Sequence, residues 1–186
     1  MMLKNTGTSY GLIAILFHWV MAVMIFVLFP LGIYMTSLDY YDRWYRISFS
    51  WHESIGMLVL MLLIFRLFWR WLNQKPDPHV EMSRWQSFAA NVAHWLFYVF
   101  IFVVCLSGYF ISTAEGQGIN IWDFVTVPAV SSFESGFSDK AGVVHWYAAL
   151  MLIALACVHT LAALYHHFIL KDRILINIIK GDRNER

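Results

Sequence analysis

The sequence predicts an all-α protein that is embedded in a membrane as a bundle of four helices. Hydrophobic residues make up 60% of its 186 residues and charged residues only 13%, whereas a soluble domain has about 45–50% apolar and about 25% charged residues. Charged residues are also absent from three runs of 30 residues or more. This composition excludes a soluble enzyme, and the net charge of +1 provides no field for binding nucleic acid.

The uncharged runs locate the helices. They cover residues 5–38, 85–114 and 141–170, and a shorter run over 54–65 is extended on both sides by apolar residues. A membrane helix needs about 20 predominantly apolar residues, and in lipid a helix satisfies its own backbone hydrogen bonds. We therefore expect a single domain over residues 1–186, with helices near 10–36, 48–71, 87–112 and 142–170.

The distribution of Lys and Arg predicts the orientation. Ten of the 13 lie at the N-terminus, in the second connection or in the C-terminal tail: Lys4, Arg66, Arg70, Lys75, Arg84, Lys171, Arg173, Lys180, Arg183 and Arg186. The other three, in the first and third loops, are Arg43, Arg46 and Lys140. Because Lys and Arg concentrate in cytoplasmic connections, we expect both termini in the cytoplasm and these two loops on the periplasmic or outer side.

Histidines are the most informative polar residues. Seven of the eight lie in or at the ends of the expected helices: His18, His52, His94, His145, His159, His166 and His167. The eighth, His79, falls in the turn between the second and third helices. An ionisable residue within a membrane span is costly and by default indicates function. A single one is equally explained by a hydrogen bond between helices, but several at matched depths favour a shared ligand.

The spacing of these histidines predicts two pairs. His145 and His159 are 14 residues apart, which places them on nearly the same helix face and roughly 21 Å apart along the axis. His52 begins the second helix at the depth of His145, and His18 lies in the first helix at the depth of His159. His94 lies about as deep as His18, so depth leaves both as partners of His159.

Two histidines at each depth suit haem better than zinc. A structural zinc ion needs four ligands in one place, whereas a bis-histidine haem needs one ligand on each side of the porphyrin. The sequence has no Cys-x-x-Cys-His motif, so the haems would be b-type. Two axial histidines leave no open iron position, which favours electron transfer over oxygen binding.

Four sequence blocks carry a family resemblance. They are His18-Trp19, His52-Glu-Ser-Ile-Gly56, Arg66-Leu-Phe-Trp-Arg70 and the stretch from His159 through His166-His167-Phe to Lys171-Asp172. Together they resemble the bacterial cytochrome b561 family, four-helix dihaem proteins of the inner membrane, over essentially the whole chain. The resemblance implies haem ligands at His18, His52, His145 and His159, and so selects His18 over His94. It also implies electron transfer from a periplasmic donor to ubiquinone, and some members act as superoxide oxidases.

The charge of the third loop, residues 113–141, bears on the donor. Four acidic residues oppose one lysine there, for a net charge of −3. Such a loop disfavours an anionic substrate such as superoxide, which needs a positive field. A local funnel from Arg43, Arg46 and Lys140 is the alternative, and ordinary loop charge explains these three residues equally well.

One more histidine is a candidate for the quinone end. His166 lies seven residues beyond His159, two turns along the same face, where an imidazole could relay protons to a quinone. The alternative is an interfacial histidine, which is the role we expect for His167. On the same side, Arg66, Arg70 and Arg84 could pair with haem propionates or orient a quinone, although the excess of cytoplasmic Lys and Arg also explains them.

Two other functions use the same features. The chain could be a cytochrome b subunit that anchors a larger dehydrogenase or hydrogenase and receives electrons from a docked protein. A histidine-lined metal transporter is disfavoured, because transporters usually show inverted repeats and broken helices and the sequence shows neither.

Overall fold

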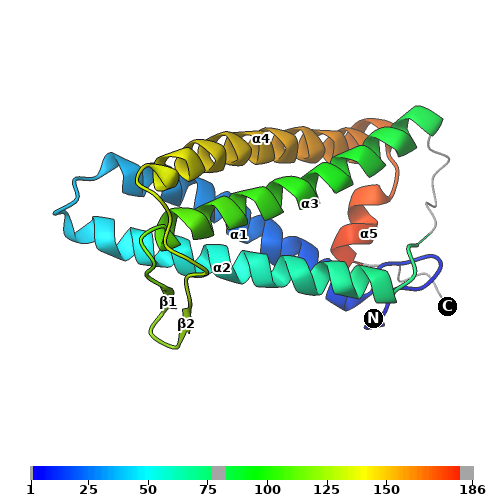
Figure 1. Cartoon of the computed structure of the whole chain (residues 1–186). Helices are drawn as coiled ribbons and strands as arrows, with labels where there is room; N and C mark the ends of the chain where they lie inside the picture. Colours follow the sequence, from blue (N-terminus) through cyan, green and yellow to red (C-terminus); the bar gives the residue numbers. More distant parts are fainter. Residues whose placement is uncertain (1, 77–82, 181–186) are drawn as a thin grey trace.

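The fold is known from a computed structural model, which describes residues 2–76 and 83–180. Four long helices run alternately in opposite directions (Figure 1). They are α1 (Leu12–Ser37), α2 (Arg43–Leu72), α3 (Arg84–Thr113) and α4 (Phe137–Tyr165). Each is long and apolar enough to cross a membrane. The predicted all-α membrane bundle is therefore confirmed.

Two helices begin five residues earlier than the apolar runs suggest, because their first turns are polar. The Asp42 side chain accepts a hydrogen bond from the backbone N–H of Trp44 and caps α2, and α4 begins directly after Gly136. A capping box between Ser83 and Gln86 starts α3. Such caps satisfy the unpaired N–H groups of a first helical turn, and they lie outside the membrane where apolar residues are not needed.

Smaller elements close the two ends of the bundle. The third loop forms a hairpin of β1 (Ile119–Ile121) and β2 (Val125–Val127), which pair antiparallel with Ile119 opposite Val127. After α4 the chain continues as a π-helix, η1 (His166–Leu170), and then as the short helix α5 (Ile174–Lys180). The C-terminal segment folds back on the bundle, because the Trp19 indole N–H donates to the carbonyl of Ile178.

We name the two ends by these elements. The hairpin end carries the α1–α2 connection and the β1–β2 hairpin, and the terminal end is where α1 begins and α4 finishes (Figure 1). A buried core between them draws on all four long helices: Met21, Val59, Leu63, Ile101, Cys105 and Leu152. Leu152 lies midway along α4 between His145 and His159. The apolar core therefore separates the two histidine depths.

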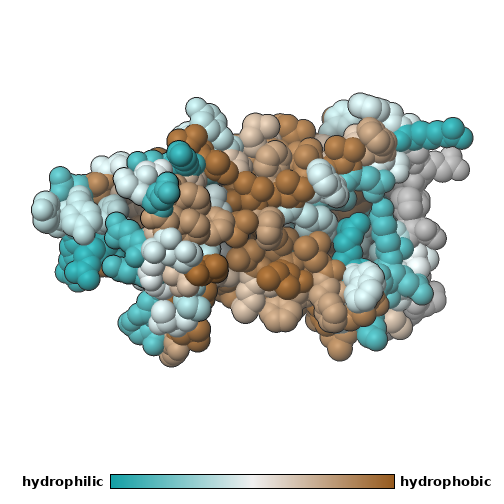
Figure 2. Space-filling view, viewed as in Figure 1, coloured by the Kyte–Doolittle hydropathy of each residue, from teal (hydrophilic) through white to brown (hydrophobic). Residues whose placement is uncertain are grey.

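The surface of the bundle suits lipid. Hydrophobic residues cover its middle, while hydrophilic residues gather toward both ends (Figure 2). Many large apolar side chains in this belt are exposed, among them Val23, Ile64 and Val158 at 59–63%. A soluble protein rarely exposes so large an apolar surface, and the hydrocarbon of a bilayer covers it without cost. The protein is an integral membrane protein.

Candidate haem-binding sites

The first candidate site is the hairpin-end pair, His52 of α2 and His145 of α4. Their ring centroids are 6.1 Å apart and the ring planes are inclined by 64°. Both rings line one apolar pocket together with Phe29, Tyr109 and Ile119. Because Ile119 belongs to β1, the hairpin covers the outer side of this pocket.

A backbone carbonyl of the facing helix α3 orients the ring of His145. Nδ1 of His145 lies 2.9 Å from the carbonyl oxygen of Val104, to which an Nδ1–H donates. The ring of His52 lies near the backbone carbonyl of Leu28, but its buried Nδ1 has no hydrogen-bond partner in the described residues. A ring held through Nδ1 presents Nε2 to the pocket, which is the arrangement typical of metal-binding histidines.

A glycine stands one turn after each of these carbonyls. A Cβ atom on Gly32 would lie 3.1 Å from Cε1 of His52, and one on Gly108 would lie 3.1 Å from Cε1 of His145. These distances are tighter than ordinary carbon contacts. The two glycines therefore leave room for each imidazole against the facing helix. Their role cannot be read from the sequence, because nothing in a helical glycine shows which ring faces it.

The second candidate site is the terminal-end cluster of His18, His94 and His159. The ring centroids of His18 and His159 are 6.4 Å apart, and those of His94 and His159 are 5.8 Å apart. Phe97 packs its ring against His159 at 5.3 Å. The structure brings the predicted partner His18 to His159, but it brings His94 slightly closer. The ambiguity left by depth in the sequence thus persists in the geometry.

The distances fit a metal held between two rings. A metal ion lies about 2 Å from each ligating nitrogen and about 3 Å from each ring centre, so two opposed imidazoles have centroids about 6 Å apart. The hairpin-end pair meets this condition. In the terminal-end cluster, both the His18–His159 pair and the His94–His159 pair meet it. At the hairpin end a pocket lies at the two rings, and along the bundle α1 packs chiefly on α2 and α4 chiefly on α3. The histidines thus fit b-type haem at both depths.

Positive charge gathers beside the terminal-end cluster. The guanidinium carbons of Arg66 and Arg70 lie 5.8 and 5.7 Å from the centre of the Tyr98 ring. Burial raises the pKa of the Tyr10 hydroxyl, and the neighbouring Arg70 opposes that rise. Within residues 2–76 and 83–180, neither arginine forms an ion pair with a carboxylate. This position suits an anionic group such as a haem propionate.

His166 is the first residue of η1 and has a partner that its sequence position does not predict. Its Nδ1 lies 2.5 Å from Oδ2 of Asp172. His167 has no hydrogen-bond partner for its buried Nδ1 in the described part of the chain, and His79 lies outside the described residues. At the other end, Arg43 and Arg46 line a surface groove with Asp42 and Trp51, but Lys140 is not among its lining residues.

Comparison with known proteins agrees with this architecture. The sequence profile of the family described as prokaryotic cytochrome b561 matches residues 9–181. "Cytochrome b561 homolog 2" of Escherichia coli K12 is 38% identical over 175 residues, which cover 94% of this chain and 93% of that protein. "Probable superoxide oxidase CybB" of Yersinia pestis is 22% identical over 176 residues, or 94% and 98% of the two chains. The chain therefore belongs to the prokaryotic cytochrome b561 family of haem-binding membrane proteins that transfer electrons.

Proposed function

We propose that this protein carries electrons across the bacterial inner membrane, from a periplasmic donor to ubiquinone, with two b-type haems. The observation that carries the proposal is the presence of opposed imidazoles, about 6 Å apart between ring centres, at each of two depths. Haem supplies one-electron redox chemistry at its iron when two histidines hold it. We assign His52 and His145 to one haem, and His18 and His159 to the other.

The chain contributes more than ligands to this function. The Val104 carbonyl orients His145, and the apolar wall of the hairpin-end pocket keeps water from it. At the terminal end, we assign Arg66 and Arg70 to the propionates of the second haem, because their side chains have no carboxylate partner in the described residues. His166 would relay protons to the quinone, as its place at the end of α4 suggests.

The proposed direction follows from the orientation. We place the terminal end in the cytoplasm, since ten of the 13 Lys and Arg residues belong to it or to the chain segments that leave it. The donor then reaches the hairpin end from the periplasm. Quinone is reduced at the opposite face, where protons are available from the cytoplasm.

Superoxide is the donor that the name of the Yersinia relative suggests. Support for it is limited to that name at 22% identity, and the net charge of −3 in the third loop disfavours an anion. Arg43 and Arg46 provide the one local concentration of positive charge in the groove beside Trp51. We therefore propose a small periplasmic reductant as donor and superoxide as the specific candidate to test.

Two measurements test the proposal. A pyridine haemochrome assay on the purified protein should give two haems per chain, and one haem per chain would contradict the pairing. Stopped-flow spectroscopy should then show haem reduction by superoxide, followed by reoxidation with a soluble ubiquinone. If superoxide does not reduce the haems but quinone reoxidises them after chemical reduction, superoxide is excluded as the donor. The proposed electron transfer across the membrane would then still stand.

A membrane-anchor subunit of a larger dehydrogenase or hydrogenase is the second candidate. Its support is the apolar surface of the third loop, where the side chains of Phe124 and Val130 are 88% and 82% exposed. A docked protein subunit could cover them. Purification from native membranes in mild detergent distinguishes the two functions, because an anchor should retain a stoichiometric partner and a self-contained electron carrier should not.

A further inference from the structure

We propose that Asp172 is a positioning residue for the quinone reaction, which holds His166 so that its Nε2 atom delivers a proton to the quinone. The inference rests on the proposed function, since it assigns part of the machinery of the quinone end. It goes beyond that function by naming the atom that exchanges the proton and the group that prepares it.

The backbone after α4 creates the contact. Lys171 adopts a left-handed conformation with φ of 56°, which ends η1 and turns the chain back. The backbone N–H groups of Lys171 and Asp172 both donate to the carbonyl of His166. This turn returns the Asp172 side chain to the imidazole that lies six residues earlier. Because a left-handed non-glycine residue is uncommon, the turn is a specific feature of this segment.

Both oxygens of the carboxylate are used. Oδ2 accepts a hydrogen bond from Nδ1 of His166 at 2.5 Å, and Oδ1 accepts one from the backbone N–H of Ile174 at 3.1 Å. The side chains of His166 and Asp172 are only 15% and 9% exposed. Capping of α5 requires just one oxygen, so a capping role accounts for the Ile174 bond and leaves the bond to His166 unexplained.

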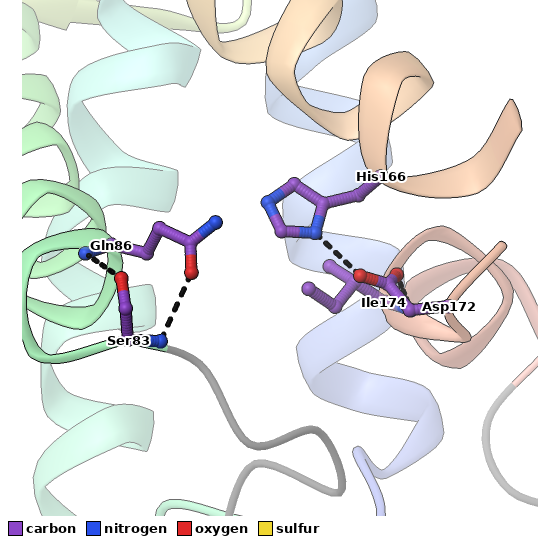
Figure 3. Close-up of polar contacts among 5 residues, drawn as sticks. All are labelled: Ser83, Gln86, His166, Asp172 and Ile174. Atoms are coloured by element: carbon purple, nitrogen blue, oxygen red, sulfur yellow. Dashed lines mark hydrogen bonds and ion pairs between the residues drawn. The ribbon is translucent and has the colours of Figure 1, made fainter. Parts of the chain in front are cut away.

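The pairing determines which ring nitrogen reacts. A carboxylate can only accept, so the proton of a neutral His166 stays on Nδ1 and Nε2 has a free lone pair. Figure 3 shows Nε2 on the side of the ring directed away from Asp172. The carboxylate of a serine protease triad acts on its histidine in the same manner.

The proposed step balances with the overall reaction. Reduction of one quinone to quinol consumes two electrons, which two one-electron donors supply as they are oxidised, and two protons. In the assigned step the Nε2–H bond of His166 breaks, an O–H bond forms on a quinone oxygen, and the neutral imidazole keeps its Nδ1–H on Asp172. Cytoplasmic water then returns a proton to Nε2 and supplies the second proton of the quinol.

Asp172→Asn tests the role of the charge with little change in shape. Asparagine caps a helix about as well as aspartate, so the bond to Ile174 is retained while the negative charge is lost. The full-length holoprotein would be mixed with soluble ubiquinone after chemical reduction. We expect kcat for quinone reduction to fall about tenfold, which is less than the 10²–10⁴-fold typical for loss of the proton-transferring side chain itself, while KM, haem content and haem reduction by the donor stay unchanged.

Two further variants make the test specific to His166. Asp172→Asn in a His166→Ala background should be no slower than His166→Ala, because non-additivity marks residues that act as a unit. His167→Ala is the matched control, since this adjacent histidine has no carboxylate partner in the described residues, and it should react at the wild-type rate. Should the Asp172→Asn substitution disturb folding, Asp172→Ser caps α5 with a side chain too short to reach His166.

The outcomes separate this inference from the proposed function. A wild-type kcat in Asp172→Asn, or slowing that adds fully to that of His166→Ala, would overturn the role of Asp172 and leave the quinone function standing. A higher KM with unchanged kcat would show a merely structural role and overturn it as well. If quinone does not reoxidise the reduced haems of the wild-type protein, the proposed function is overturned and this inference with it.

Discussion

The two ends of the bundle hold their histidines in different surroundings. At the hairpin end, the Val104 carbonyl orients His145, and a glycine in each facing helix leaves room for the rings of His52 and His145. At the terminal end, three histidines gather beside Arg66 and Arg70. The hairpin-end pocket is mostly apolar, with Glu53 among its lining residues, whereas the terminal end carries two arginines and an additional histidine.

This difference matches two kinds of chemistry. Electron uptake from a one-electron donor needs a rigid ligand pair and no proton, which is what the hairpin end provides. Quinone reduction needs protons, which the histidines of the terminal end could supply. The arginines there could bind anionic groups such as haem propionates. The comparison therefore fits the proposed direction, and it shares Arg66 and Arg70 with the orientation argument from Lys and Arg.

The largest expected effect is the loss of one haem at a time. His52→Ala or His145→Ala should remove only the hairpin-end haem, and His18→Ala or His159→Ala only the terminal-end haem, because each iron loses an axial ligand. The haemochrome assay should fall from two haems per chain to one, and redox titration should show which component has disappeared. Loss of both haems from every variant would show that the two ends are not independent.

His166→Ala should have a smaller effect, confined to the terminal end. Removal of a proton-transferring side chain typically slows a reaction by 10²–10⁴, so we expect reoxidation by quinone to slow by about 100-fold. Haem reduction by the donor takes place at the other membrane face, about 30 Å away, and should keep its rate. Equal slowing of both phases would indicate general damage, and an unchanged reoxidation would make His166 an interfacial residue.

Glycine substitutions should weaken the hairpin end to a lesser degree. In Gly32→Ala or Gly108→Ala the new methyl group lies 3.1 Å from a ring carbon, and a ring held by iron cannot move aside freely. Overpacking of this kind costs about 1–3 kcal/mol. We expect partial loss of the hairpin-end haem on dilution or heating, followed by its absorbance, with the terminal-end haem retained.

Gly142→Ala is the matched control for these two variants. Gly142 also lies in a membrane helix, but a Cβ atom there would have no other atom within 4 Å. Its haems should be retained as in the wild type. If Gly142→Ala loses haem as readily as Gly108→Ala, the loss reflects the helix and not the contact with the ring.

The sequence allowed the helices and the histidine depths to be predicted, for physical reasons. A bilayer requires long uncharged runs, and the rise of a helix converts the 14 residues between His145 and His159 into a separation in depth. The roles of Gly32 and Asp172 could not be predicted. The contact of Gly32 depends on which helix packs against α1, and that of Asp172 on the left-handed turn at Lys171, which no local pattern indicates.

The hairpin was missed for a related reason. Its turn places Trp122 and Asp123 at φ of 42° and 61°, where Asn-Gly or Asp-Gly is the usual pattern. The Asn120 side chain donates to Asp123 across the turn at 2.6 Å, and Trp122 packs its ring on Trp51. These contacts with neighbours stabilise a turn that its own residues do not favour.

The smallest expected effect is that of His94→Ala. It decides whether His18 or His94 is the second haem ligand beside His159, which neither the sequence nor the geometry determines. His94 lies nearer to His159 than His18 does, at 5.8 against 6.4 Å between ring centres, yet the family resemblance selects His18 as the ligand. We therefore expect His94→Ala to keep two haems per chain, whereas His18→Ala keeps one. His94 should then affect only the surroundings of the terminal-end haem, seen as a small change in its reduction potential. The opposite result, with one haem in His94→Ala and two in His18→Ala, would move the ligand from α1 to α3. The terminal-end site would then lie entirely between α3 and α4, the pair of helices that pack most closely along the bundle.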